Sequence, residues 1–79
     1  MKSTRYAIVV EKAARNFAAY VPDLPGCVAT APTRRAVERR IREAIELHLA
    51  GMREDGLPIP KPRTTLAWVD VVPPRRKAG

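Results

Sequence analysis

The sequence predicts an α+β fold in which one helix packs on a mainly antiparallel sheet, with the element order strand, strand, strand, helix, strand. Three observations predict this βββαβ order. Strand-like runs fill residues 6–31, an apolar stripe with helical spacing covers 37–52, and a β-branched run returns at 65–72. The 79 residues form one small domain that buries only about 60% of its unfolded surface, so we expect a surface for self-association.

The first two expected strands form a hairpin. Residues 6–12 (Tyr-Ala-Ile-Val-Val-Glu-Lys) and 17–21 (Phe-Ala-Ala-Tyr-Val) are rich in β-branched and aromatic side chains. The short connection between them favours antiparallel pairing. Both faces of the pair are apolar, which indicates a sheet covered on both sides. The helix covers one face, and a second copy of the chain is the simplest cover for the other.

A proline-rich connector, residues 21–28 (Val-Pro-Asp-Leu-Pro-Gly-Cys-Val), follows the hairpin. Each proline removes a backbone donor and favours an extended residue before it, while Gly26 permits a positive φ. We therefore expect a rigid, mostly extended connector with a bend near its end, in which Asp23 caps its own turn. Residues 27–31 then form a short third strand that Pro32 ends.

The helix is expected to begin after Thr33, whose hydroxyl suits an N-cap, and to end near Asp55, because Gly56 suits the position after the last turn. Its apolar stripe consists of Val37, Ile41, Ala44, Ile45, His48, Leu49 and Met52. In this stripe His48 is a semi-buried packing residue. Proline at every second position over 58–62 predicts an extended return to the sheet, and residues 65–72 form the last strand.

Three segments of this chain resemble the signature of HicB-like antitoxins of bacterial toxin–antitoxin systems. They are residues 19–28, 41–49 and 54–62, and with the strands they cover roughly residues 5–72. The motif residues, to which we assign a structural role, are Pro22, Asp23, Leu24, Pro25, Gly26, Cys27, Gly56, Pro58, Pro60 and Pro62.

The resemblance implies a partial ribonuclease H-like fold and a binding function. HicB-type proteins occlude HicA, a small ribonuclease toxin that cleaves mRNA, and many repress their own operon through a separate DNA-binding domain. We expect a HicB-like domain over 1–74 and a basic, disordered tail over 75–79. Nothing after Val72 is long enough for a DNA-binding module, so operator binding is in doubt.

Catalysis is not expected. Ribonuclease H chemistry needs several carboxylates converging on metal ions, and only Glu11 and Asp70 can lie on adjacent strands. One histidine and one cysteine exclude a disulfide within the chain and argue against structural zinc, so no metal or cofactor is expected. Cys27 is interpreted as a small core residue. The sequence shows neither a signal peptide nor an apolar run of roughly 20 residues, so we expect a cytoplasmic protein.

The net charge of +7 leaves two interpretations open. It favours contact with nucleic acid or an acidic protein surface, and an arginine-rich proteome explains it equally well. Arg34 and Arg35 lie in the first helical turn, where they oppose the helix dipole and where a phosphate would relieve the conflict. Solvated arginines at an exposed end are the simpler explanation. The candidate contacts are Arg34, Arg35, Arg39, Arg40, Arg75, Arg76 and Lys77.

The leading hypothesis is a non-catalytic HicB-type antitoxin, or an orphan binding protein of this type, that forms a homo-oligomer (dimer or tetramer) and neutralises a HicA-type toxin by direct occlusion. The alternative is a basic RNA- or DNA-binding module that uses the arginines. Tyr20 and Trp68 are candidates for the oligomer interface, although aromatic residues on a sheet can also stack on bases.

Overall fold

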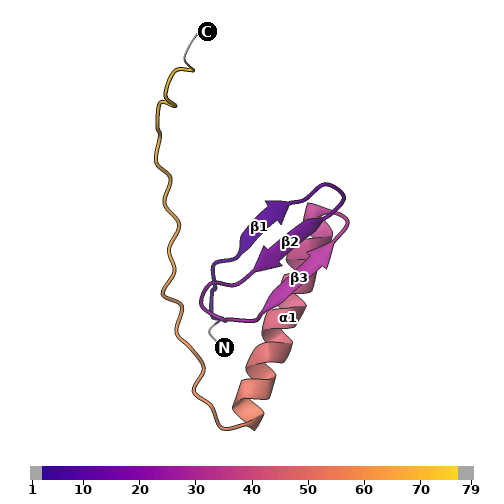
Figure 1. The fold of residues 1–79 in the computed structure, drawn as a ribbon. Coiled ribbons are helices and arrows are strands. Elements are labelled where there is room, and N and C mark those ends of the chain that lie inside the picture. The colour runs from indigo at the N-terminus through magenta and orange to yellow at the C-terminus, as the bar shows by residue number, and fades with distance from the viewer. Residues whose placement is uncertain (1–2, 77–79) are drawn as a thin grey trace.

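The computed structural model describes residues 3–76 and consists of three strands followed by one helix (Figure 1). The strands are β1 (Val9–Lys12), β2 (Phe17–Tyr20) and β3 (Val28–Ala31), and the helix is α1 (Arg34–Glu54). The predicted α+β class and the order of these four elements are confirmed.

β2 is the central strand of an antiparallel sheet with the order β1-β2-β3. Val10 lies opposite Ala19 between β1 and β2, and Ala19 lies opposite Ala29 between β2 and β3. The Ala13 N–H donates to the Asn16 carbonyl at 2.8 Å and closes the hairpin. Because side chains alternate between the two faces of a strand, Val10, Ala19 and Ala29 share one face of the sheet.

Both ends of α1 carry the caps that the sequence predicts. The Thr33 hydroxyl accepts a hydrogen bond from the Ala36 N–H at 3.1 Å, so Thr33 is the N-cap. At the other end Gly56 has φ +71°, its N–H donates to the Arg53 carbonyl at 3.1 Å, and the Leu57 N–H donates to the Met52 carbonyl at 2.9 Å. This pair of bonds is a Schellman motif, which needs a left-handed residue and so favours glycine at position 56.

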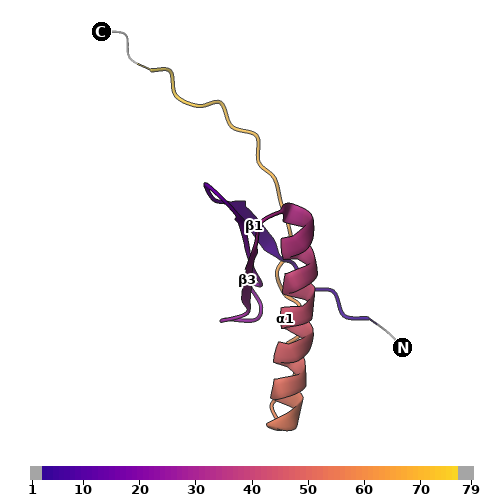
Figure 2. The same cartoon turned by 90° about the vertical axis from the view of Figure 1, so that its right-hand side faces the viewer.

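The core lies between α1 and one face of the sheet (Figure 2). Its buried residues are Ala19, Val21, Leu24, Cys27, Ala31, Val37 and Ile41. The fully buried residues of α1, Val37 and Ile41, lie in the first half of the helix, because the second half extends past the end of the sheet (Figure 1). The expected half-buried position of His48 on the helix is confirmed.

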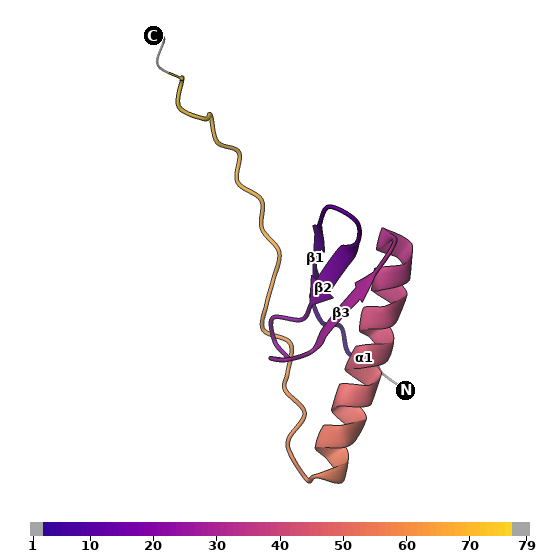
Figure 3. The same ribbon diagram turned by 45° about the vertical axis from the view of Figure 1, so that its right-hand side comes forward.

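The expected fifth element does not form. Residues 57–76 contain no strand, and residues 65–76 are exposed and extend away from the rest of the chain (Figure 3). A strand needs a neighbouring strand for its backbone hydrogen bonds, and in the single chain residues 65–72 have none. The βββαβ order is therefore βββα, and the chain has a radius of gyration of 16.8 Å, against roughly 12 Å for a compact chain of this length. The division into a domain over 1–74 and a tail stays a prediction.

Candidate protein-binding surfaces

The connector, residues 21–28, folds into two successive tight turns and is not mostly extended as expected. The Leu24 N–H donates to the Val21 carbonyl at 3.0 Å, the Cys27 N–H donates to the Leu24 carbonyl at 3.0 Å, and the Val21 N–H donates to the Cys27 carbonyl at 3.2 Å. Gly26 adopts φ +85° in the second turn. The prolines rigidify these turns, and Leu24, only 1% exposed, is inserted into the core.

Asp23 holds the proline-rich return segment and does not cap its own turn as the sequence suggests. One carboxylate oxygen, Oδ2, accepts the backbone N–H groups of Arg63 at 2.9 Å and Thr64 at 3.0 Å. The other oxygen, Oδ1, accepts the Thr64 hydroxyl at 2.8 Å. The N–H of Thr64, followed by that of Arg63, lowers the pKa of Asp23 because these donors stabilise the charged carboxylate.

Tyr6 makes a second contact with the same return segment. Its hydroxyl donates to the Pro60 carbonyl, so Pro60, an expected motif residue, lies beside the N-terminal residues. Burial, and then the negative charge of Asp23, raises the pKa of the Tyr6 hydroxyl. Sequence patterns indicate neither contact, because both contacts join residues that are far apart along the chain.

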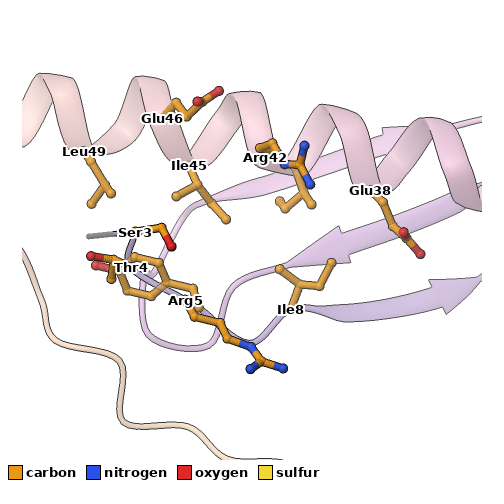
Figure 4. A pocket seen from close by; sticks show the side chains of 11 residues that line it. Ser3, Thr4, Arg5, Ile8, Glu38, Arg42, Ile45, Glu46 and Leu49 are labelled. Atoms are coloured by element: carbon orange, nitrogen blue, oxygen red, sulfur yellow. The ribbon is translucent and has the colours of Figure 1, made fainter. Parts of the chain in front are cut away.

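An apolar groove of about 610 Å³ lies between the N-terminal residues and α1 (Figure 4). Ile45 and Leu49 point from the helix toward Ser3 and Thr4, whereas the Glu46 carboxylate points away from this space (Figure 4). The remaining lining residues are Arg5, Tyr6, Ile8, Glu38, Ile41 and Arg42. A groove with apolar walls and a charged rim can bind an apolar segment.

The sheet face opposite α1 carries an exposed apolar row. Tyr20 lies opposite Val9 on one side and Val28 on the other, and these neighbours share a face of the sheet. Tyr20 is 42% exposed and Val28 is 63% exposed. The second expected interface residue, Trp68, lies on the extended segment and is 92% exposed. The structure thus places the two aromatic residues on separate elements.

The expected basic contacts do not form one patch. Arg34 Nε lies 3.1 Å from Glu38 Oε2, and Arg40 Nη1 donates to the Thr30 carbonyl at 2.8 Å. Arg35 and Arg39 are exposed on the first half of α1. Arg75 and Arg76 are at the far end of the extended segment. In Figures 1 and 3 this end lies away from the start of α1, and Lys77 lies outside the described residues.

The acidic residues of the described part of the chain do not gather at one place. No three His, Cys, Asp or Glu side chains within 3–76 lie close enough together to hold a metal ion. Glu11 belongs to β1, but Asp70 lies on the segment that does not pair, so these two carboxylates are not on adjacent strands as expected. In the same part of the chain, no helix has the length and apolar character that would let it cross a membrane.

Comparisons with known proteins place the fold among toxin–antitoxin proteins. Residues 6–72 match the family model for the HicB-like antitoxin of bacterial toxin–antitoxin systems. A chain in the solved HicA3 and HicB3 toxin–antitoxin complex has a similar structure, with a TM-score of 0.65 and 28% identity, covering 76% of this chain and 70% of that one.

Two relatives are similar in sequence. An uncharacterized 14.9 kDa protein in the rep-hol intergenic region of Haemophilus phage HP1 is 38% identical over 56 residues, which are 71% of this chain. The chain spans only 42% of that phage protein's length. A UPF0150 protein of Helicobacter pylori strain J99 is 34% identical over 64 residues, which cover 80% of this chain and 89% of that protein.

Proposed function

The chain belongs to the family of HicB-like antitoxins of bacterial toxin–antitoxin systems, and from this premise we propose that it neutralises a HicA-type toxin, an mRNA-cleaving ribonuclease, by direct occlusion. The observation that carries the proposal is the likeness to a chain of the HicA3 and HicB3 complex at 28% identity. Neutralisation of this kind is a binding function. It requires a surface that covers the toxin, and it needs no catalytic group on the antitoxin.

We assign toxin binding to the exposed row of Val9, Tyr20 and Val28. An exposed apolar row on a sheet is suited to a protein partner, because aromatic residues at the centre of an interface carry much of its binding energy. The sheet beneath the row is fixed by pairing on both sides of β2, so little ordering is needed on binding. Since the toxin's substrate is mRNA, the complex acts in the cytoplasm.

The test uses the full chain and a HicA-type toxin. We expect co-expression to restore growth to cells that produce the toxin, and an equimolar amount of the purified chain to stop mRNA cleavage. Tyr20→Glu should weaken protection by about 30-fold or more, because it places a charge in the centre of the interface. Leu47→Glu is the matched control, since Leu47 is also an exposed apolar residue, 77% exposed, but lies on α1.

Two outcomes would contradict different parts of the proposal. Unchanged toxin activity in the presence of the folded wild-type chain would overturn the antitoxin function. Full protection by Tyr20→Glu would leave that function in place and overturn the assignment of the sheet face. Circular dichroism of each variant establishes that the fold is retained, because Tyr20 and Leu47 are exposed in the single chain.

A nucleic-acid-binding module is the alternative function. It is favoured by the first turn of α1, which contains no acidic residue, and by the exposure of Arg35 and Arg39. Against it, Arg34 and Arg40 are engaged within the chain.

A further inference from the structure

The segment of residues 65–72 exposes apolar side chains to an unusual extent. Its large apolar residues, Leu66, Trp68, Val69, Val71 and Val72, are 70–95% exposed. The whole chain has an accessible surface of 7423 Å², against about 4,800 Å² for a compact monomer of 8.8 kDa. In an extended conformation both faces of the segment carry apolar residues, a pattern typical of a strand inside a sheet. The segment therefore lacks a partner that its sequence is suited to bind.

The outer edge of β1 is also without a partner. β1 pairs only with β2, and within residues 3–76 no hydrogen bond reaches its outer edge. The opposite edge of the sheet, at β3, is partly occupied. α1 packs beside that strand, and the Arg40 guanidinium donates to the Thr30 carbonyl at 2.8 Å. An open edge presents a row of backbone donors and acceptors that can add a further strand.

The segment begins close to this edge but does not close on it. Asp23 fixes Arg63 and Thr64, which sets the point where the segment starts. A gap of about 490 Å³ then separates residues 64–66 from residues 5–8, which lead into β1. In Figures 1 and 3 the segment continues past β1 and away from it. The chain's own edge and its own strand-forming segment are thus both left open.

We propose that residues 65–72 pair with the outer edge of β1 in a second copy of the chain, and that two copies exchange these segments reciprocally. A two-fold arrangement pairs both open edges with both exposed segments. The assembly is then closed, because no open edge remains to bind a third copy. Pro73 and Pro74 set the end of the added strand, because neither can donate to a ladder. This inference is independent of the toxin-binding proposal.

The test compares the molar mass of three full-length proteins by light scattering over a concentration series. The wild type should be a dimer. Val69→Pro combined with Asp70→Pro should weaken dimerisation by about tenfold or more, because neighbouring N–H groups point to opposite sides of a strand, so one of the two prolines removes a ladder donor. Arg75→Pro is the matched control, since it adds a proline to the same exposed segment beyond Pro74, and it should remain a dimer. Neither variant should alter the far-ultraviolet spectrum of α1.

A mixture of isotope-labelled and unlabelled chains identifies the contact directly. In NMR spectra filtered for contacts between copies, we expect the indole of Trp68 to show contacts with residues 9–12 of the other copy. A monomeric wild type would overturn the proposal, whether the segment is free or lies on its own β1. So would a dimer that the two prolines do not weaken, or a dimer without contacts between Trp68 and β1 of the other copy.

Discussion

Asp23 joins two segments that are 40 residues apart in the sequence. Its carboxylate takes three donors, two of them from the backbone, and this arrangement leaves both oxygens occupied. Because Leu24, the next residue, is buried in the core, the carboxylate is held in place by the same turns that anchor the connector. The connector therefore has two roles: Leu24 packs in the core, and Asp23 fixes the path of the return segment.

The contact of Asp23 should depend on pH. Its pKa is lowered from the ordinary 3.8, so the contribution of this carboxylate is fully present above that value and is lost as pH falls through the lower folded value. In an acid titration followed by NMR, the amide signals of Arg63 and Thr64 should shift only below the ordinary aspartate pKa. Asp23→Ala should speed hydrogen exchange at these two amides.

Asp70→Ala is the matched control, because Asp70 lies on the exposed segment. It should leave exchange at Arg63 and Thr64 unchanged. If Asp23→Ala also left it unchanged, the carboxylate would not hold the return segment.

At the scale of elements, local signals allow prediction from the sequence and distant contacts do not. Thr33 and Gly56 were predicted at the two ends of α1, because a cap depends on residues within one turn of it. The turns of the connector were missed, since prolines are compatible with extended and turn conformations, and the burial of Leu24 decides between them. The partner of Asp23 and the missing strand at 65–72 depend on which segments meet in space, which periodicity does not encode.

The N-cap of α1 should contribute measurably to stability. Thr33→Ala removes the acceptor of the Ala36 N–H and should lower the free energy of unfolding by about 1 kcal/mol. Thr33→Ser retains a hydroxyl and should remain close to wild type. Urea unfolding followed by circular dichroism measures both variants, and equal stability of the alanine and wild-type proteins would show that the cap contributes nothing.

For the whole molecule, the charge of +7 raises the question of nucleic acid. The antitoxin proposal predicts negligible affinity for random single-stranded RNA at physiological salt. It also predicts that Arg35→Gln combined with Arg39→Gln changes toxin neutralisation by no more than about twofold, as is usual for exposed charges. Binding titrations over a salt series test this. A steep fall in affinity with salt, with a slope reduced by about 1 for each arginine removed, would instead support direct phosphate contacts.

The burial of Cys27 has a practical consequence for measuring how this small core opens. The side chain is 4% exposed, and burial raises the pKa of its thiol, so alkylating reagents meet neither an accessible sulfur nor a thiolate in the closed state. It is also the only cysteine of the chain. The rate at which the unmodified protein is alkylated therefore reports how often the connector detaches from the sheet, without any engineered label.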